Sequence, residues 1–161
     1  PAMREQPAYG FAAPESYAWH RALLQRAGDR YDPRVRTRIE KGATLMAWEY
    51  IDLLQARQHW MARMEAAMQP YDALLCPTVP IVAPPIAAVA PGAERDAEFF
   101  RVNHLLLRNT SAVNLLDGCA LSLPCHVHGE LPVGLMVWHG ALRDDTVLNV
   151  GLQIEEILQK Q

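Results

Sequence analysis

The chain has 161 residues, of which 50% are hydrophobic and 20% charged, an ordinary composition for one globular core. Its formal charge of −3, with both signs interspersed, gives no electrostatic reason to expect binding to nucleic acid or to an anionic membrane. No apolar run approaches the ~20 residues of a membrane helix, and the first residues do not form a secretory signal peptide. Three cysteines in apolar surroundings, Cys76, Cys119 and Cys125, predict reduced thiols in the core of a cytoplasmic protein.

Helices are expected in the first part of the chain. A helix is predicted over 14–27, because Pro14 suits a first helical position and Gly28 a position just past the end. Asp32 and Pro33 favour a turn that opens a short helix over 34–40.

The longest helix is predicted over about 43–69. Arg57 interrupts its apolar side, so we expect a buried partner or a guanidinium that reaches water. The apolar stripe of this helix is expected to consist of Ala43, Met46, Ala47, Tyr50, Ile51, Leu54, Met61, Met64 and Met68.

Short strands follow in the second part. They are predicted over 72–76, 119–123 and 133–138, the last two forming a hairpin whose Gly129 takes positive φ. The proline-rich connection 77–92 cannot be regular helix or a central strand. A helix with a break is predicted over 95–116 and a last helix over about 145–159, with Asp144 as its N-cap. The class is therefore α/β, in one region of 161 residues.

Several of these segments match known motifs in order. They are Asn114-Leu115-Leu116, Ala120-Leu121-Ser122-Leu123-Pro124, Leu131-Pro132-Val133-Gly134-Leu135-Met136, and the segments 32–39 and 71–78. In this arrangement the chain resembles the C-terminal part of the amidase signature family. Asp117-Gly118-Cys119 stands where the family has Gly-x-Pro. The resemblance implies a mixed β-sheet flanked by several helices and continued by strands from elsewhere.

The resemblance also implies a chemistry that these residues do not contain. The family uses a serine nucleophile, a second serine and a lysine in a Gly/Ser-rich region N-terminal to the matched segments. This chain has no Gly-Ser-Ser cluster, and its lysines are Lys41 and Lys160. We therefore expect the C-terminal portion of an amidase, inactive alone, with no catalytic residue and no cofactor or metal of its own. The chain lacks a Met at position 1, which fits a trimmed or excised piece.

Three residues are candidates for contact with substrate. In the amidotransferase branch an arginine of a similar segment binds the carboxylate of the amide donor, and Arg38 stands at that position; a guanidinium fork suits a carboxylate. The alternative is a surface arginine on a short basic helix. Asn109 and Thr110 end an apolar helix where the family approaches the acyl pocket, and the alternative is helix capping and local hydrogen bonding to the backbone.

Other groups offer weaker chemistry. Ser111 and Ser122 could be nucleophiles only beside a base, and neither lies in a Gly-x-Ser-x-Gly elbow. His126 and His128 could face one side of an extended segment and hold a metal, but zinc prefers four ligands and an exposed loop is the simpler interpretation.

Three hypotheses about function follow. The first is part of a serine amidase that hydrolyses a small-molecule amide, whose partner is the missing N-terminal catalytic part. The second is a non-catalytic subunit that completes an amidase in trans, and the third is a metal-binding domain through His126 and His128. An exposed sheet edge should also favour self-association into a homo-oligomer.

Overall fold

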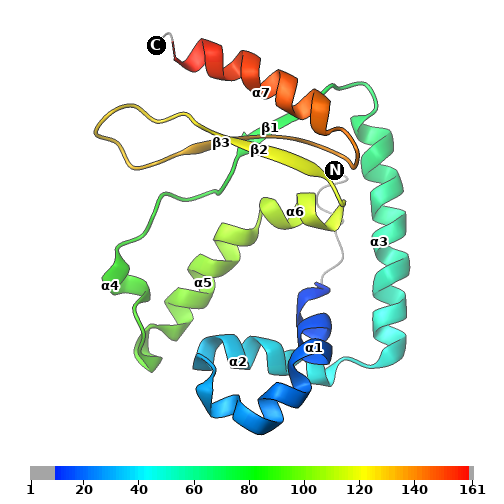
Figure 1. Cartoon of the computed structure of the whole chain (residues 1–161), viewed down its shortest axis with the longest axis vertical. Coiled ribbons are helices and arrows are strands. Elements are labelled where there is room, and N and C mark those ends of the chain that lie inside the picture. The colour runs from blue at the N-terminus through cyan, green and yellow to red at the C-terminus, as the bar shows by residue number, and fades with distance from the viewer. Residues whose placement is uncertain (1–9, 160–161) are drawn as a thin grey trace. The chain divides into compact units, whose positions relative to one another are not determined.

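The computed structural model describes residues 10–159 (Figure 1). Contacts within the described chain separate two compact units, residues 10–60 and residues 61–159. None of the described helices is both long and apolar enough to span a bilayer.

The first unit consists of helices joined by short turns. Helix α1 (Ala12–Ala27) leads through a 3-10 turn into α2 (Pro33–Glu40), as the sequence predicts. Asp32 is the N-cap of α2, since its Oδ1 accepts hydrogen bonds from the N–H groups of Arg34 and Val35 at 2.9 and 3.1 Å. Helix α1 ends before Gly28 as expected, but Gly28 does not take the left-handed conformation of a helix-ending glycine. Its φ is −63°, and it begins the 3-10 turn that follows.

Gly42 allows close packing inside this unit. It lies in the 3-10 turn Lys41–Thr44, where a Cβ atom would stand 2.1 Å from the carbonyl oxygen of Ala13 on α1. Only glycine fits such a distance, because real Cβ atoms do not approach other atoms closer than about 3.0 Å.

The long helix α3 (Ala47–Met68) occurs where it was predicted, and Met64 and Met68 of the expected stripe are buried, but the N-terminal part of the buried face differs from the prediction. The buried side chains are Leu53, Trp60, Met64 and Met68, at helical spacing. Ile51 and Leu54, expected inside, are exposed. Arg57 falls on the buried line after all, with its guanidinium 5.7 Å from the centre of the Phe11 ring. The stripe was misplaced because apolar residues occur on several faces of this helix.

In the second unit the three expected strands form one sheet. The strands are β1 (Leu74–Pro77), β2 (Cys119–Pro124) and β3 (Gly134–His139), each within a few residues of its predicted position. Their order is β1-β3-β2 and every pair is antiparallel. The α/β class is confirmed; the parallel pairs of a mixed sheet do not occur among the described strands.

Helix α7 (Asp144–Leu158) packs on this sheet. Val137 on the central strand is 0% exposed and forms a core with Leu123 and Val147. Gly151 brings the helix close, because a Cβ there would lie 2.3 Å from Leu121. Asp144 is not the N-cap that we expected: Arg143 holds that position, Asp144 begins the helix, and no side chain caps it.

The connection between β1 and β2 contains the predicted break. After a mainly irregular proline-rich stretch with one short turn, α4 (Ile86–Val89), and a 3-10 turn (Ala93–Arg95), the chain forms α5 (Asp96–Leu107) and α6 (Thr110–Leu115). Helix α6 ends in a Schellman motif, since the N–H of Gly118 donates to Val113 at 2.9 Å and that of Asp117 to Asn114 at 3.2 Å. Asp117 takes the left-handed position with φ 53°, so Asp-Gly replaces the family's turn with a standard helix end.

Candidate functional site

Asn109 lies at the break between α5 and α6 and reaches across to β1. Its Nδ2 donates to the carbonyl oxygen of Pro77, 32 residues earlier, at 2.7 Å. The side chain makes no capping bond to α6. Of the two expected roles for Asn109, capping is therefore wrong, and the residue instead fixes the end of the first strand.

Two hydroxyl groups meet beside that strand end. The Oγ1 of Thr78 and the Oγ of Ser122 are 2.5 Å apart, and the N–H of Thr78 donates to the carbonyl of Gly134 at 2.8 Å. A Cβ on Gly134 would stand 2.6 and 2.7 Å from the two hydroxyl oxygens. Because Gly134 on the central strand has no side chain, the hydroxyls of Thr78 and Ser122 can meet above it. We call Thr78, Ser122, Gly134 and Asn109 the strand-end cluster.

No general base accompanies these hydroxyls among the contacts of the described residues. The partner of Ser122 is the neutral hydroxyl of Thr78, not an imidazole or an amine. His126, the closest candidate in sequence, accepts instead from the N–H of Val133 at 3.4 Å. A serine nucleophile needs a base within hydrogen-bond reach, so the contacts offer no local catalytic triad.

Thr110, next to Asn109, has a local role. Its Oγ1 donates to the carbonyl of Leu107 one turn back at 3.3 Å. This is the helix-end hydrogen bonding that we weighed as the alternative to substrate contact.

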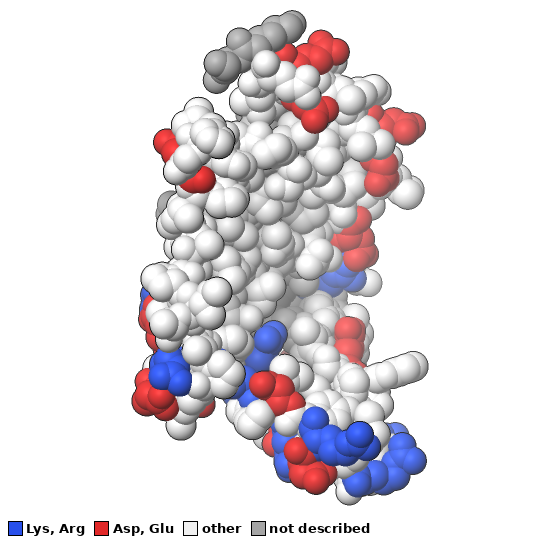
Figure 2. Space-filling model, turned by 60° about the vertical axis from the view of Figure 1, so that its left-hand side comes forward, with Lys and Arg blue, Asp and Glu red and all other residues white. Residues whose placement is uncertain are grey.

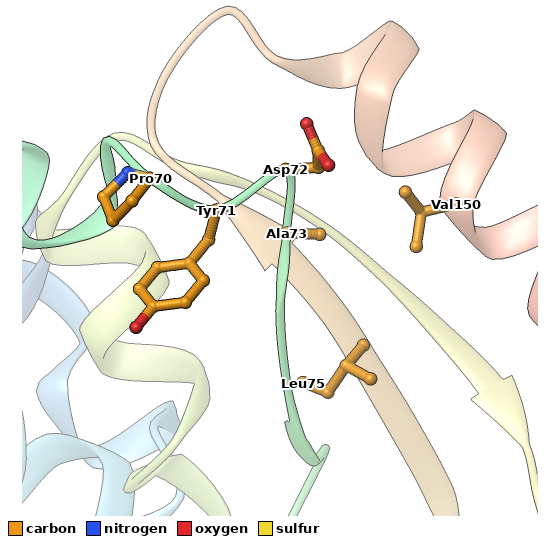
Figure 3. A pocket seen from close by; sticks show the side chains of 6 residues that line it. All are labelled: Pro70, Tyr71, Asp72, Ala73, Leu75 and Val150. Atoms are coloured by element: carbon orange, nitrogen blue, oxygen red, sulfur yellow. The ribbon is translucent and has the colours of Figure 1, made fainter.

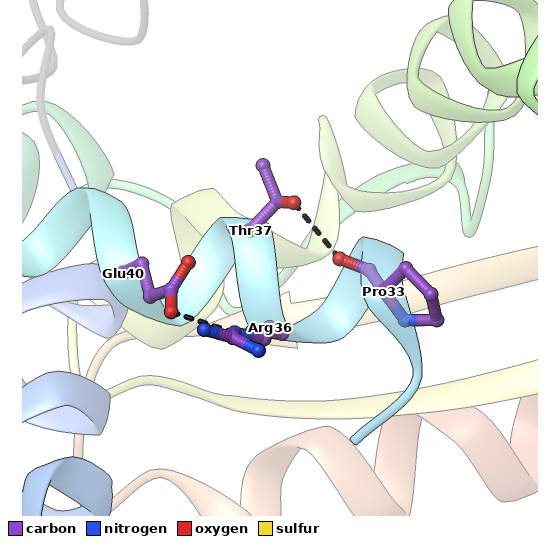
Figure 4. A network of polar contacts seen from close by, with 4 residues as sticks. All are labelled: Pro33, Arg36, Thr37 and Glu40. Carbon is purple, nitrogen blue, oxygen red and sulfur yellow. Dashed lines mark hydrogen bonds and ion pairs between the residues drawn. The ribbon is translucent and has the colours of Figure 1, made fainter. Parts of the chain in front are cut away.

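Arg38 lies on α2, in the other unit, and its side chain is exposed. Figure 4 shows its neighbours on the helix: Thr37 Oγ1 donates to the carbonyl of Pro33 at 2.8 Å, and Arg36 pairs with Glu40 at 2.7 Å. Arg34, on the same helix, is only 9% exposed. The three arginines are therefore not one surface group, and Arg34 is a buried cation that the sequence analysis did not separate from the others.

A shallow pocket of about 310 Å³ opens between β1 and α7 (Figure 3). Apolar groups such as Leu75 and Val150 form most of its wall, with the carboxylate of Asp72 on the side of the helix. His139, which contacts the pocket residue Tyr71, is 9% exposed; its Nδ1 accepts from the N–H of Gly140 at 2.7 Å and its Nε2 faces the carbonyl of Tyr71 at 3.3 Å. These two bonds require a neutral imidazole with its proton on Nε2.

The thiols differ in their surroundings. All three cysteines are free, but Cys125 is exposed and does not belong to the core as expected. Burial raises the pKa of the Cys76 thiol, and the neighbouring indole of Trp138 offsets part of that rise. Among residues 10–159, no three His, Cys, Asp or Glu side chains come together as a metal site would require.

The arrangement of elements and motifs matches a known family. The model of the Amidase family matches residues 12–148, most of the chain. The chain belongs to the amidase family.

Individual relatives agree with this assignment. The chain is 27% identical over 157 residues to a glutamyl-tRNA(Gln) amidotransferase subunit of Saccharolobus solfataricus, and the match covers 94% of this chain and 31% of the relative. It is 27% identical over 150 residues to a 2-amino-5-chloromuconic acid deaminase of Comamonas testosteroni, covering 92% of this chain and 32% of that one. This amidase chain therefore spans about a third of the length of the curated relatives it matches.

Solved structures give the same fold. A crystal structure of an amidase superposes with a TM-score of 0.71 at 27% identity, covering 89% of this chain and 33% of that one. A 6-aminohexanoate cyclic dimer hydrolase superposes with a TM-score of 0.74 at 18% identity, over 91% of this chain and 33% of that one, and supports the fold alone.

Thr78, Gly134 and His139 were not predicted from the sequence as members of these polar contacts. The Thr78–Ser122 pair and the histidine contact join segments far apart in sequence, 44 and 68 residues. Pro77-Thr78 and Val133-Gly134 did stand in the matched motifs, which is the only signal that pointed to them.

Proposed function

We propose that this chain is the C-terminal part of an enzyme that hydrolyses the C–N bond of a carboxamide, with a serine nucleophile outside residues 1–161. The observation that carries the proposal is the Amidase family match over residues 12–148, a range that includes the helix-break and hairpin segments. The absence of a base among the contacts of Ser122 supports a nucleophile elsewhere.

The proposed reaction has two steps. The hydroxyl of the active serine attacks the amide carbonyl, the C–N bond breaks, and the amine or ammonia leaves with a proton. Water then hydrolyses the acyl-enzyme to a carboxylic acid and restores the serine. Backbone N–H groups would stabilise the oxyanion in both steps.

Residues of this chain would serve binding. Asn109 shapes the end of β1, and Thr110 lies beside it at the helix break. Arg38 offers an exposed guanidinium, which suits a substrate that carries a carboxylate. Their part in this proposal is to form pocket walls, not to break bonds.

The catalytic part of the amidase is the partner that we propose for this chain. Among the described strands, β1 and β2 each pair only with β3, so both edges of the sheet present unpaired backbone groups. Large apolar side chains are exposed on α3 and α7: Trp48, Ile51, Leu54, Leu148, Leu152 and Ile157. Figure 2 shows a face with wide areas free of either charge. Further strands of the same protein, or of a separate subunit, would cover such surfaces.

Ammonia release tests this proposal. Protein that contains these residues, isolated from the cells that make it, should release ammonia from simple carboxamides. The 161-residue chain alone should release none, because nucleophile and base are elsewhere. Ammonia release by the isolated chain would contradict the placement of the nucleophile, and the intact mass of the native protein would distinguish one long chain from a separate subunit.

A further inference from the structure

The hydroxyl pair of the strand-end cluster has hydrogen-bonding capacity that its own contacts do not use. We infer that Thr78 and Ser122 form a subsite that binds a primary carboxamide group, an inference that rests on the proposed amidase function. Both hydroxyls lie over the glycine of the central strand, and Ser122 is exposed while Thr78 is half-buried.

The donors and acceptors of the pair match an amide. Each hydroxyl has one donor and two acceptor sites, and the bond between them at 2.5 Å uses one donor and one acceptor. One O–H donor and three lone pairs remain. A carboxamide brings a carbonyl acceptor and an NH₂ donor, so it can use both kinds of free site. A carboxylate can only accept and an ammonium can only donate, and each would leave half of the pair unmatched.

The pair is held in place before any ligand arrives. Thr78 is fixed by its N–H bond to Gly134 at 2.8 Å, and the preceding carbonyl, of Pro77, by Asn109 at 2.7 Å. Any side chain at residue 134 would clash with both hydroxyls. Such fixed donors and acceptors lose little conformational entropy on binding. Asn109 is a positioning residue in this account, since it acts through the strand end.

A second polar group lies on the same sheet face. The register places Ser122 opposite Met136 and Ala120 opposite Trp138, so these residues share one face. Trp138 is 3% exposed, and the group that its indole meets is the thiol of Cys76, a weak hydrogen-bond acceptor. This face therefore carries a second donor that is only weakly matched among the described residues.

Binding of small ligands by the 161-residue chain tests the inference. The chain, labelled with ¹⁵N, is titrated with propionamide, propionate and propylammonium while its backbone amide signals are followed. We expect saturable shifts at Thr78, Ser122 and Gly134 with propionamide, and markedly weaker binding of the other two. Ser122→Ala and Thr78→Val should each weaken propionamide binding about tenfold, the loss of one hydrogen bond.

A matched control and two outcomes decide the matter. Thr37→Val removes a threonine hydroxyl that bonds only a helix carbonyl in the other unit, and should leave the affinity unchanged. Equal shifts with propionate, or an affinity that Ser122→Ala does not alter, would overturn the inference. Because no bond is broken in this experiment, its failure is separate from a failure of ammonia release, which would overturn the proposed function instead.

Discussion

Residues 10–60 and residues 61–159 are stabilised in different ways. In the first unit, helix caps and turns act over a few residues, as where Asp32 caps α2, and the more distant contacts join helices and turns without strand pairing, as where Tyr50 donates to Glu15 across 35 residues. In the second, the sheet joins segments far apart, as where Leu75 pairs with Val137, and His139 bonds to Tyr71 across 68 residues. The groups of the strand-end cluster come together only through such distant pairing.

This difference between the two units matters for stability. Local contacts can form while the rest of the chain is unfolded, whereas distant strand pairs must first close long loops. We therefore expect substitutions in the two units to weaken different parts of the molecule, and substitutions at distant contacts to affect the strand-end cluster.

The two glycines at close backbone contacts should give the largest losses. A Cβ would stand 2.1 Å from the Ala13 carbonyl in Gly42→Ala and 2.4 Å from the His139 carbonyl in Gly118→Ala. Because backbone must move, we expect each to lower the free energy of unfolding by about 3 kcal/mol or more. Hydrogen exchange should localise the loss to residues 10–60 for Gly42→Ala and to residues 61–159 for Gly118→Ala. Loss of protection across both units in either variant would contradict the division.

Gly129→Ala is the control for these two variants. It has no atom within 4 Å of the added Cβ, and its φ of 90° gives strain without a clash. A loss of about 1 kcal/mol is expected.

His139→Leu should give the next largest loss of stability. It leaves the buried N–H of Gly140 and the partly buried carbonyl of Tyr71 without partners, so a loss of about 2 kcal/mol in the free energy of unfolding is expected by urea unfolding. The same change at exposed His128, His128→Leu, should have almost no effect. Equal losses at the two positions would mean that the buried contacts do not stabilise the second unit.

The helix caps should differ between the units. Asp32→Ala removes two side-chain hydrogen bonds at the start of α2 and should cost about 1 kcal/mol. Asp144→Ala removes a carboxylate that makes no cap bond and only faces the helix dipole, so about 0.3 kcal/mol is expected. Thermal unfolding of the two variants measures both losses. A larger loss for Asp144→Ala than for Asp32→Ala would mean that Asp144 is an N-cap, as its sequence suggests.

Leu142→Gly should give a small gain. Leu142 is 94% exposed and has φ 60°, a left-handed conformation that costs energy for a leucine and little for glycine. After the greater freedom of glycine in the unfolded chain is counted, a stabilisation of about 0.5 kcal/mol is expected. If Leu142→Gly unfolded at a lower urea concentration than the unsubstituted chain, the backbone strain that we assign to Leu142 would be contradicted.

The sequence predicted elements better than faces and contacts. Prolines, glycines and apolar runs located the strands, the hairpin with positive φ at Gly129 and the helical stretch over 95–116, whose break the structure places near Asn109. The buried face of α3 was predicted correctly at Met64 and Met68 and wrongly at Ile51 and Leu54, because apolar residues occur on several faces of this helix. Asp144 looked like Asp32 in sequence, yet only Asp32 bonds the following N–H groups.

The candidate site was less predictable than the fold. The motifs drew attention to Asn109, but its bond to Pro77 depends on how the helix break lies against the strand. The Thr78–Ser122 pair depends on strand register, and a slip of one residue would separate the two hydroxyls. Whether Arg38 and Thr110 contact substrate stays a prediction.

Ammonia release by the native protein is the most direct test of the central claim. Protein containing residues 1–161 would be isolated from its own cells with an antibody raised against this chain and incubated with propionamide and related carboxamides. We predict time-dependent ammonia release that a serine-reactive fluorophosphonate abolishes, with the adduct on a serine outside these residues. An adduct on Ser111 or Ser122, or no release from any carboxamide, would contradict that claim.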